Sequence, residues 1–255
     1  MNEHTTWLDL LPGYHNLEEF FRQYLGRGWS NAMFPPQEHF SLTHVFLAFF
    51  VGLCLMLVGL SYRRSARSAA AVEPSRELGL FAFVHMMLSV LFRFMVEILG
   101  SEKDARRFFP VAAGIFLFIM FSDLIGLLPG FEPPTAHLQM NLAIALSVFV
   151  MTHAYGIRDQ GWRYIKQFTG DTWYMAPLML VLELVSHIVR PLSLTVRLLG
   201  NMFADHKVLA IFTFLFPLLV PIPFLFLGIL VSLIQALVFM TLSVIYFSLA
   251  TSQEH

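Results

Sequence analysis

The feature that most constrains this chain is a series of apolar segments long enough to cross a lipid bilayer. A helix needs about 20 apolar residues to span the ~30 Å hydrocarbon core. Residues 45–62 and 138–156 contain no charged side chain, and residues 108–131 contain only Asp123. The whole chain is 57% hydrophobic and 13% charged, whereas soluble domains carry about 25% charged residues. The sequence therefore predicts an all-α integral membrane protein.

Two further apolar segments, residues 175–216 and 222–250, are longer than the membrane is thick. At 1.5 Å per residue they would be roughly 60 Å and 40 Å long as helices, and a proline-rich stretch with Pro217 and Pro221 lies between them. Excess length is accommodated by tilting. We expect five transmembrane helices, over about 43–62, 108–131, 138–157, 175–216 and 222–250, with the last two forming a long, strongly tilted hairpin.

The segment over about 79–100 has a different character. It is apolar but includes Arg93 and Glu97, and basic residues flank it. This pattern favours an amphipathic helix on the membrane surface; the alternative is a further crossing.

The distribution of basic residues predicts the orientation. Eight Lys and Arg lie between residues 62 and 107 and three lie in the loop after Gly156, whereas the first forty residues have two basic against five acidic side chains. Because cytoplasmic loops carry the excess of Lys and Arg, we expect an extracytoplasmic N-terminal segment over 1–40, a membrane domain over 41–255 and a cytoplasmic C-terminus.

Several function classes have no support in the sequence. No GxxxxGK[ST], GxGxxG, HExxH or CxxC motif is present, and Cys54 is the one cysteine. The formal net charge of −1 gives no basic field for a nucleic acid. We expect no nucleotide chemistry, no cofactor, no metal site and no nucleic-acid partner.

Polar side chains recur along one face of the first long segment. A charge at the bilayer centre costs about 2.5–3.5 kcal/mol, so such a stripe must face protein or water. Arg197 lies near the middle of the segment, where its side chain reaches neither surface easily; the alternative is an ion pair with a neighbouring acid. The members of the stripe are Glu183, His187, Arg190, Arg197, Asn201 and Asp205.

The second long segment has one strongly polar side chain, Gln235, close to its midpoint. In a hairpin it would lie about level with Arg197, which favours a donor–acceptor contact between Gln235 and Arg197. The alternative is an amide whose hydrogen bonds are made by backbone or helix packing.

Three stretches of this chain resemble the a subunit family of bacterial rotary (F-type) ATP synthases. They are RPLSLTVRLLGNMFADH at 190–206, QALVFMTLSVIY at 235–246 and LIGLLPG at 124–130, and Asn141 opens the span after the last of these. The resemblance covers roughly residues 40–252.

The resemblance implies roles for individual residues. Arg197 matches the essential stator arginine, and Asn201 and Gln235 match its polar companions. Glu183 and His206 fall where the family has half-channel residues. An outer half-channel would contain Asp123, Asn141, Asp205 and His206, and an inner one Glu183 and His187.

For some of these residues a structural role is the alternative: a pair with Arg190 for Glu183, and a contact at the membrane interface for His206. The chain departs from the family pattern at Gly228, where some members carry an ionisable residue that pairs with the group at the His206 position.

The resemblance also implies a function and partners. The chain would be the proton-conducting stator subunit of an ATP synthase in the cell inner membrane. Its partners would be a ring of c subunits, the peripheral-stalk b subunits and, indirectly, the soluble catalytic sector. Proton or sodium coupling would be decided mostly by the ring.

Two other classes of function are alternatives. One is a stand-alone transporter or channel with Arg197 as a counter-ion for the substrate, although the sequence shows no internal repeat. The other is a haem protein, which needs paired ligands at matching depth on neighbouring helices. The candidate histidines look scattered along the chain: His44, His85, His137, His153, His187 and His206.

Overall fold

The computed structural model describes residues 43–68, 80–128, 131, 133–161, 164, 176–215 and 221–251. In this part of the chain the regular elements are α2 (Thr43–Ser68), α3 (Leu80–Leu99), α4 (Glu102–Gly126), the 3-10 turn η2 (Pro134–Ala136), α5 (Leu138–Gln160), α7 (Ala176–Leu215) and α8 (Pro221–Thr251). No strand occurs among them, which confirms the all-α fold class. The predicted N-terminal segment over 1–40 lies outside the described residues.

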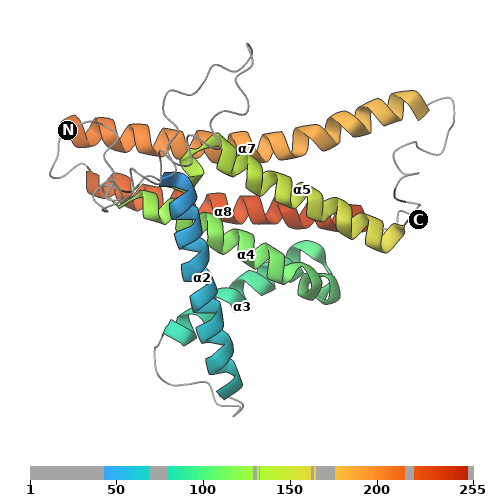
Figure 1. The fold of residues 1–255 in the computed structure, drawn as a ribbon, viewed down its shortest axis with the longest axis horizontal. Coiled ribbons are helices and arrows are strands. Elements are labelled where there is room, and N and C mark those ends of the chain that lie inside the picture. Colours follow the sequence, from blue (N-terminus) through green and yellow to red (C-terminus); the bar gives the residue numbers. More distant parts are fainter. Residues whose placement is uncertain are drawn as a thin grey trace, which may run out of the picture.

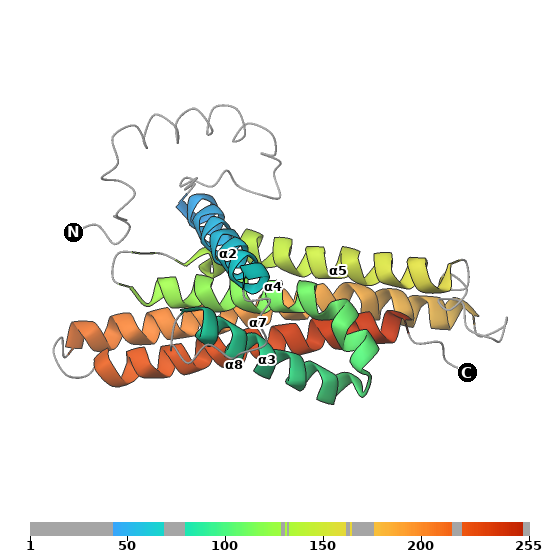
Figure 2. The ribbon, with the colours of Figure 1, turned by 90° about the horizontal axis from the view of Figure 1, so that it is seen from below.

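Four long helices lie side by side, and one crosses them. α4, α5, α7 and α8 run roughly along the long axis of the molecule, whereas α2 stands steeply across them (Figures 1 and 2). α4 packs along α8, and α5 packs on both α7 and α8. The hairpin predicted from the two longest segments is present, because α7 and α8 run alongside each other in both views.

Within the described residues, four helical stretches are long and apolar enough to cross a membrane. They are Ala82–Leu99, Glu102–Gly126, Leu138–Gln160 and Ile222–Thr251, and the apolar part of α2, Val45–Ser61, is shorter. The first of these stretches contains most of α3. Length and composition therefore permit α3 to cross, and its placement on the membrane surface stays a prediction.

The corner between α3 and α4 explains why α4 begins earlier than the apolar run that predicted it. Gly100 has φ +65, a conformation that costs glycine nothing because it has no Cβ. Ser101 then caps α4, since its side chain accepts a hydrogen bond from the backbone N–H of Asp104. Glu102 and Asp104 in the first turn suit the positive end of the helix dipole. The charged first turn of the helix therefore lies before residue 108.

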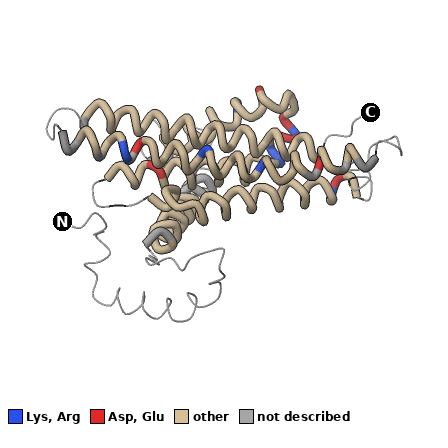
Figure 3. The backbone as a smooth tube through the Cα atoms, turned by 90° about the horizontal axis from the view of Figure 1, so that it is seen from above, with Lys and Arg blue, Asp and Glu red and all other residues tan. Residues whose placement is uncertain are grey.

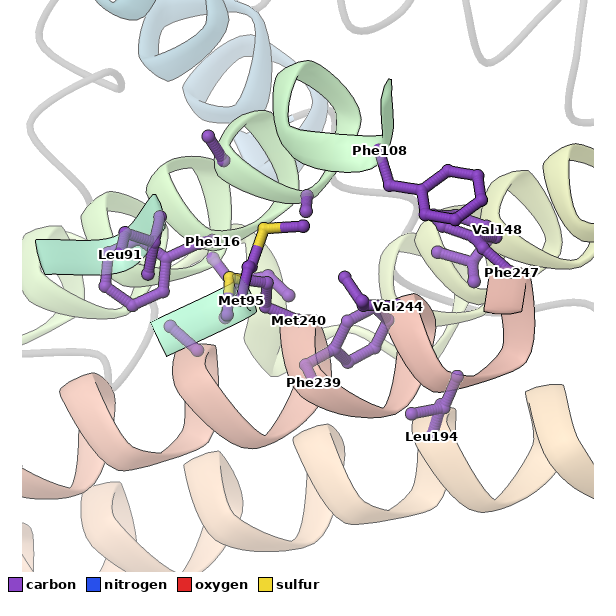
Figure 4. Packing of buried hydrophobic residues seen from close by; sticks show 14 of the residues in the cluster. Leu91, Met95, Phe108, Phe116, Val148, Leu194, Phe239, Met240, Val244 and Phe247 are labelled. Atoms are coloured by element: carbon purple, nitrogen blue, oxygen red, sulfur yellow. The ribbon is translucent and has the colours of Figure 1, made fainter. Parts of the chain in front are cut away.

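The core lies where α3, α4, α5, α7 and α8 meet (Figure 4). Phe108 and Phe247 contact at one end, with ring centroids 5.6 Å apart and an interplanar angle of 46°, and Met95, Phe239 and Met240 fill the middle. Small residues let the helix backbones approach closely, as is usual in membrane bundles. The alanines of this core are Ala105, Ala112, Ala113, Ala145 and Ala236.

The hairpin leaves a large apolar surface uncovered. Leu192, Val196 and Phe203 of α7 and Leu233 and Ile234 of α8 are all exposed, and charged residues are sparse along the helices (Figure 3). In a membrane such a surface faces lipid or another subunit. The hairpin is therefore available for contacts beyond this chain.

Candidate functional site

The polar residues of α7 belong to two clusters along the helix, with Arg197 between them. Side chains from other elements complete each cluster. The first, which we call the Asp123 cluster, comprises Asp123, Thr135, Asn141, Asn201, Asp205 and Gln235. The second, the His187 cluster, comprises His153, Glu183, His187, Arg190 and Tyr246.

A hydrogen-bonded chain joins three elements in the Asp123 cluster. Asp123 of α4 is buried and accepts a hydrogen bond of 2.6 Å from the hydroxyl of Thr135 in η2. The amide of Asn141 in α5 donates to the backbone carbonyl of Thr135 at 2.8 Å. Thr135 was missed by the sequence analysis, because nothing in a short uncharged connector marks it as a partner for a carboxylate.

A close backbone approach makes this chain of hydrogen bonds possible. A Cβ placed on Gly126 at the end of α4 would lie 2.6 Å from both Cβ and Cγ of Pro133, which is inside van der Waals contact. The absence of a side chain at Gly126 therefore lets the segment before η2 fold back onto α4 and carry Thr135 to Asp123.

A narrow cavity of about 10 Å³ adjoins the cluster, room for about one water molecule. Asp123, Asp205 and Ser232 line it together with Asn201 and Gln235. Asp205 is half-buried. His206 follows it on α7, and its side chain lies outside the described residues.

Asn201 and Gln235 connect the two helices of the hairpin. The amide nitrogen Nδ2 of Asn201 donates to Oε1 of Gln235 at 2.6 Å. Gln235 therefore bonds to Asn201, one turn beyond Arg197, and its expected contact with Arg197 itself is not among the contacts of the described residues.

Arg197 presents its side chain at the surface of α7. The described part of the chain contains ion pairs of Arg106, Arg107 and His187, but none for Arg197. The alternative of an ion pair with a neighbouring acid therefore has no support among the described residues.

Three exposed residues on the same face of α7 as Arg197 are small. Ser193, Gly200 and Ala204 are all exposed, and a Cβ added to Gly200 would meet no atom of the described chain within 4 Å. Small residues are what allows a second membrane helix to approach closely.

The His187 cluster lies nearer the start of α7. His187 is buried, and its Nδ1 is 2.8 Å from the carbonyl oxygen of Glu183 and 3.3 Å from Oε1 of the same residue. The guanidinium of Arg190 lies 5.3 Å from the ring centre of Tyr246. Glu183 therefore approaches His187, whereas the alternative pairing predicted Arg190 as its partner.

The histidines are less scattered than the sequence indicates. His153 of α5 contacts His187 of α7, with ring centroids 5.2 Å apart and an interplanar angle of 68°. Such an edge-on contact leaves no space for a macrocycle between the two rings, which a bis-histidine haem requires. His153 was missed as a site residue, because its partner is distant in the sequence and only the packing of α5 on α7 brings the two together.

The departure at Gly228 has a packing reason. Gly228 of α8 is buried, and a Cβ there would lie 2.7 Å from Cδ2 of Leu127. An ionisable side chain at this position would have to displace Leu127, which also lines the cavity beside Asp123.

These features define a class of protein. Helices of membrane-spanning length carry a polar stripe, buried acids and amides surround a narrow cavity, and an exposed arginine lies between two polar clusters. This is the arrangement of an ion-conducting membrane protein, in which intramembrane polar groups mark the ion pathway.

Comparison with known proteins identifies the family. The ATP synthase A chain family matches residues 44–248. "ATP synthase subunit a 1" of Syntrophotalea carbinolica is 44% identical over 86% of this chain and 90% of its own length. "ATP synthase subunit a" of Desulfosudis oleivorans is 41% identical over 86% of this chain and 93% of its own length, and that of Geobacter sulfurreducens is 40% identical over 80% and 85%.

The chain therefore belongs to the family of ATP synthase subunit a. Its role is that of a proton-conducting stator subunit in a bacterial membrane, which it crosses with several helices. The alternative of a stand-alone transporter has no support.

Proposed function

We propose that Arg197 is the stator arginine that meets the carboxyl groups of a rotating c-ring. The observation that carries this proposal is a guanidinium exposed near the middle of the long helix α7, with no acid of the described chain paired to it. An unpaired charge at that depth is costly, so a partner outside the chain should supply the acid.

The surface around Arg197 fits such a partner. Ser193, Gly200 and Ala204 leave space beside the guanidinium, and the flanking side chains of α7 and α8 are apolar and exposed. A ring helix with a carboxyl group could approach closely here. Arginine suits the task because it stays ionised in a low dielectric and offers five donors in a planar fork to a moving carboxylate.

Two half-channels would deliver and remove the proton. Three buried polar atoms near the Asp123 cluster have no hydrogen-bond partner in the described chain: Ser122 Oγ, Asn141 Oδ1 and Gln235 Nε2. Buried polar groups are normally paired with protein or water, so these atoms favour a hydrated outer half-channel past Asp123, Asn141, Asp205 and His206. Glu183 and His187 would line the inner one.

Coupling follows from the position of Arg197 between the two paths. A neutral ring carboxyl can face lipid, and its proton arrives through one half-channel. When the carboxyl reaches Arg197, the guanidinium favours the carboxylate and the proton leaves through the other path. Asn201 and Gln235, joined one turn beyond Arg197, would hold the two hairpin helices in register at this point. The fixed positive charge also blocks a direct leak of protons.

The remaining partners and the orientation belong to the same proposal. The membrane domain over 41–255 would lie in the inner membrane, with the N-terminal segment 1–40 outside and the C-terminus in the cytoplasm. Peripheral-stalk b subunits would hold the chain against rotation. Single cysteines at Ser101 and Thr169, with Cys54 replaced, should react with a membrane-impermeant reagent from the cytoplasmic side only.

Replacement of Arg197 tests the proposal. Arg197→Ala should abolish ATP-driven pumping and ATP synthesis in vesicles that hold the assembled complex, and it should raise the passive proton leak. Arg197→Lys should assemble with little coupled transport, because a buried ammonium loses its proton more readily and cannot bind in a bidentate fashion. A well-coupled Arg197→Ala enzyme would overturn the role of Arg197.

A further inference from the structure

The His187 cluster contains a titratable residue, His153, to which the half-channels described above assign no role. His153 comes from α5 and His187 from α7, two helices that pack along each other. Their rings meet with centroids 5.2 Å apart. Both rings line a narrow cavity of about 10 Å³ together with Arg190, Thr152 and Tyr246, which is room for about one water molecule.

The hydrogen bonds of the two rings indicate the same tautomer. Nδ1 of His153 is 2.8 Å from the carbonyl oxygen of Phe149, and Nδ1 of His187 is 2.8 Å from that of Glu183. A carbonyl oxygen only accepts, so each Nδ1 carries the hydrogen. The nitrogen that gains and loses a proton is then Nε2 in both rings.

We propose that His153 and His187 form a two-site proton relay in the inner half-channel, with His153 as a proton-carrying residue supplied by α5. This inference rests on the proposed function. A proton moves between Nε2 of His187 and Nε2 of His153, directly or through one water molecule in the cavity. When one imidazole accepts it, the other returns to the neutral form, and no other bond is made or broken.

The charges around the pair favour transfer over permanent capture. Oε1 of Glu183 lies 3.3 Å from Nδ1 of His187 and stabilises an imidazolium there. Arg190 lines the same cavity and disfavours a second positive charge. Two imidazolium rings in contact would also repel each other, which disfavours a second proton on the pair.

Aromatic rings are among the remaining neighbours of the pair, beside residues such as Thr152, Pro191 and Leu194 that line the same cavity. Tyr164 packs edge-on against His153 with centroids 5.9 Å apart, and Tyr246 of α8 holds the guanidinium of Arg190. Glu183 contacts Nδ1 of His187, the nitrogen that keeps its hydrogen. Proton exchange between the two histidines therefore involves their Nε2 atoms.

Passive proton flux through the assembled membrane sector tests the relay. Vesicles are stripped of the soluble sector, a potential is imposed, and the flux is measured across about pH 5–8, the range in which histidine titrates. His153→Phe keeps an aromatic ring and removes the proton site, so we expect a several-fold lower flux and a flatter pH profile. His153→Gln keeps polarity and volume, and it should flatten the profile with a smaller loss.

Controls separate a relay from a structural role. His85 lies on α3, its side chain is exposed, and it does not belong to the His187 cluster. His85→Phe should therefore have the passive proton flux of the wild type. The passive proton flux of the double variant His153→Phe/His187→Phe should be no lower than that of the slower single variant, because the two sites lie in series on one path. Wild-type flux in His153→Phe, an equal loss at every pH, or additive losses in the double variant would each overturn the relay.

The same vesicles separate this inference from the proposed function. If Arg197→Ala uncouples the enzyme while His153→Phe and His153→Gln behave as wild type, the relay alone is wrong. If Arg197→Ala stays coupled, the proposed function is wrong and the relay falls with it.

Discussion

Asn201 and Gln235 are joined by a hydrogen bond of 2.6 Å that links α7 to α8 one turn beyond Arg197. Gln235 is almost completely buried, and its Nε2 has no partner among the described residues. The pair therefore fixes the register of the hairpin and still offers two donor hydrogens to the cavity beside it. The same two side chains therefore determine the alignment of α7 with α8 and supply the donors beside the cavity.

A double-mutant cycle should measure this link. Asn201→Leu and Gln235→Leu should each lower the thermal stability of the assembled membrane sector and the rate of ATP-driven pumping. The double variant should be little worse than either single one, because each change already breaks the bond. Coupling energies between membrane helices are about 0.6–1.7 kcal/mol. Fully additive effects would show that the two amides act independently.

Gly200 should matter for assembly and not for the fold of this chain. A Cβ there meets no atom of the described chain within 4 Å, so Gly200→Leu should leave insertion of the chain unchanged. It should nevertheless weaken association with the ring, because leucine would fill the space beside Arg197. Gly114→Leu in α4 is the matched control, since Gly114 also has open space around it. Recovery of the ring on purification and pumping rate are the measurements; equal recovery for both variants would contradict the proposed ring surface.

The hydroxyl of Thr135 should support the outer half-channel through Asp123. Thr135→Val keeps the shape and removes the donor at 2.6 Å from Asp123, which leaves a buried acceptor unpaired at a cost of about 1–3 kcal/mol. We expect slower ATP-driven pumping in Thr135→Val and near-normal pumping in Thr135→Ser. Identical rates of ATP-driven pumping in the valine and serine variants would show that the Thr135 hydroxyl has no role in the outer half-channel.

Sequence patterns predicted the fold class well, because a membrane permits only elements that pair their own backbone groups. The polar face of α7 followed from helical spacing. Gln235 was placed level with Arg197, whereas its partner is Asn201, one turn further along α7. Thr135 and His153 were missed for one reason. Each acts through a contact with another element, and helix packing and the turn at Gly126 decide such contacts. α4 begins at Glu102, before the apolar run that starts at residue 108. Its first turn is charged, so the search for apolar residues did not include it.

Two adjacent arginines at the start of α4 should differ sharply in their effect on stability. Arg107 makes a bidentate ion pair with Asp159 of α5, with Nη2 and Oδ1 2.7 Å apart, and its guanidinium lies 5.3 Å from the ring centre of Tyr155. Among the described residues, the ion-pair partner of Arg106 is Glu102, one turn back on the same helix, and both side chains are largely exposed, at 71% and 61%. Its guanidinium also lies 5.8 Å from the ring centre of Phe92 in α3.

The contrast has a physical cause. The Arg107 pair joins the ends of two helices and its side chains are 33% and 24% exposed, so water screens it less than a fully open pair. Its loss should cost about 1–2 kcal/mol after allowance for screening. An exposed pair within one helix is worth about 0.3–0.5 kcal/mol. Arg107→Ala should therefore lower the thermal midpoint of the assembled membrane sector clearly, and Arg106→Ala should barely change it.

Lysine tests the geometry of the Arg107 pair. Arg107→Lys keeps the charge but loses the planar fork and much of the stacking on Tyr155, so it should recover only part of the stability. High salt should narrow the difference between wild type and Arg107→Ala, since added ions screen the pair. Equal thermal midpoints for Arg106→Ala and Arg107→Ala at low salt would show that the bond between α4 and α5 contributes nothing to holding the two helix ends together.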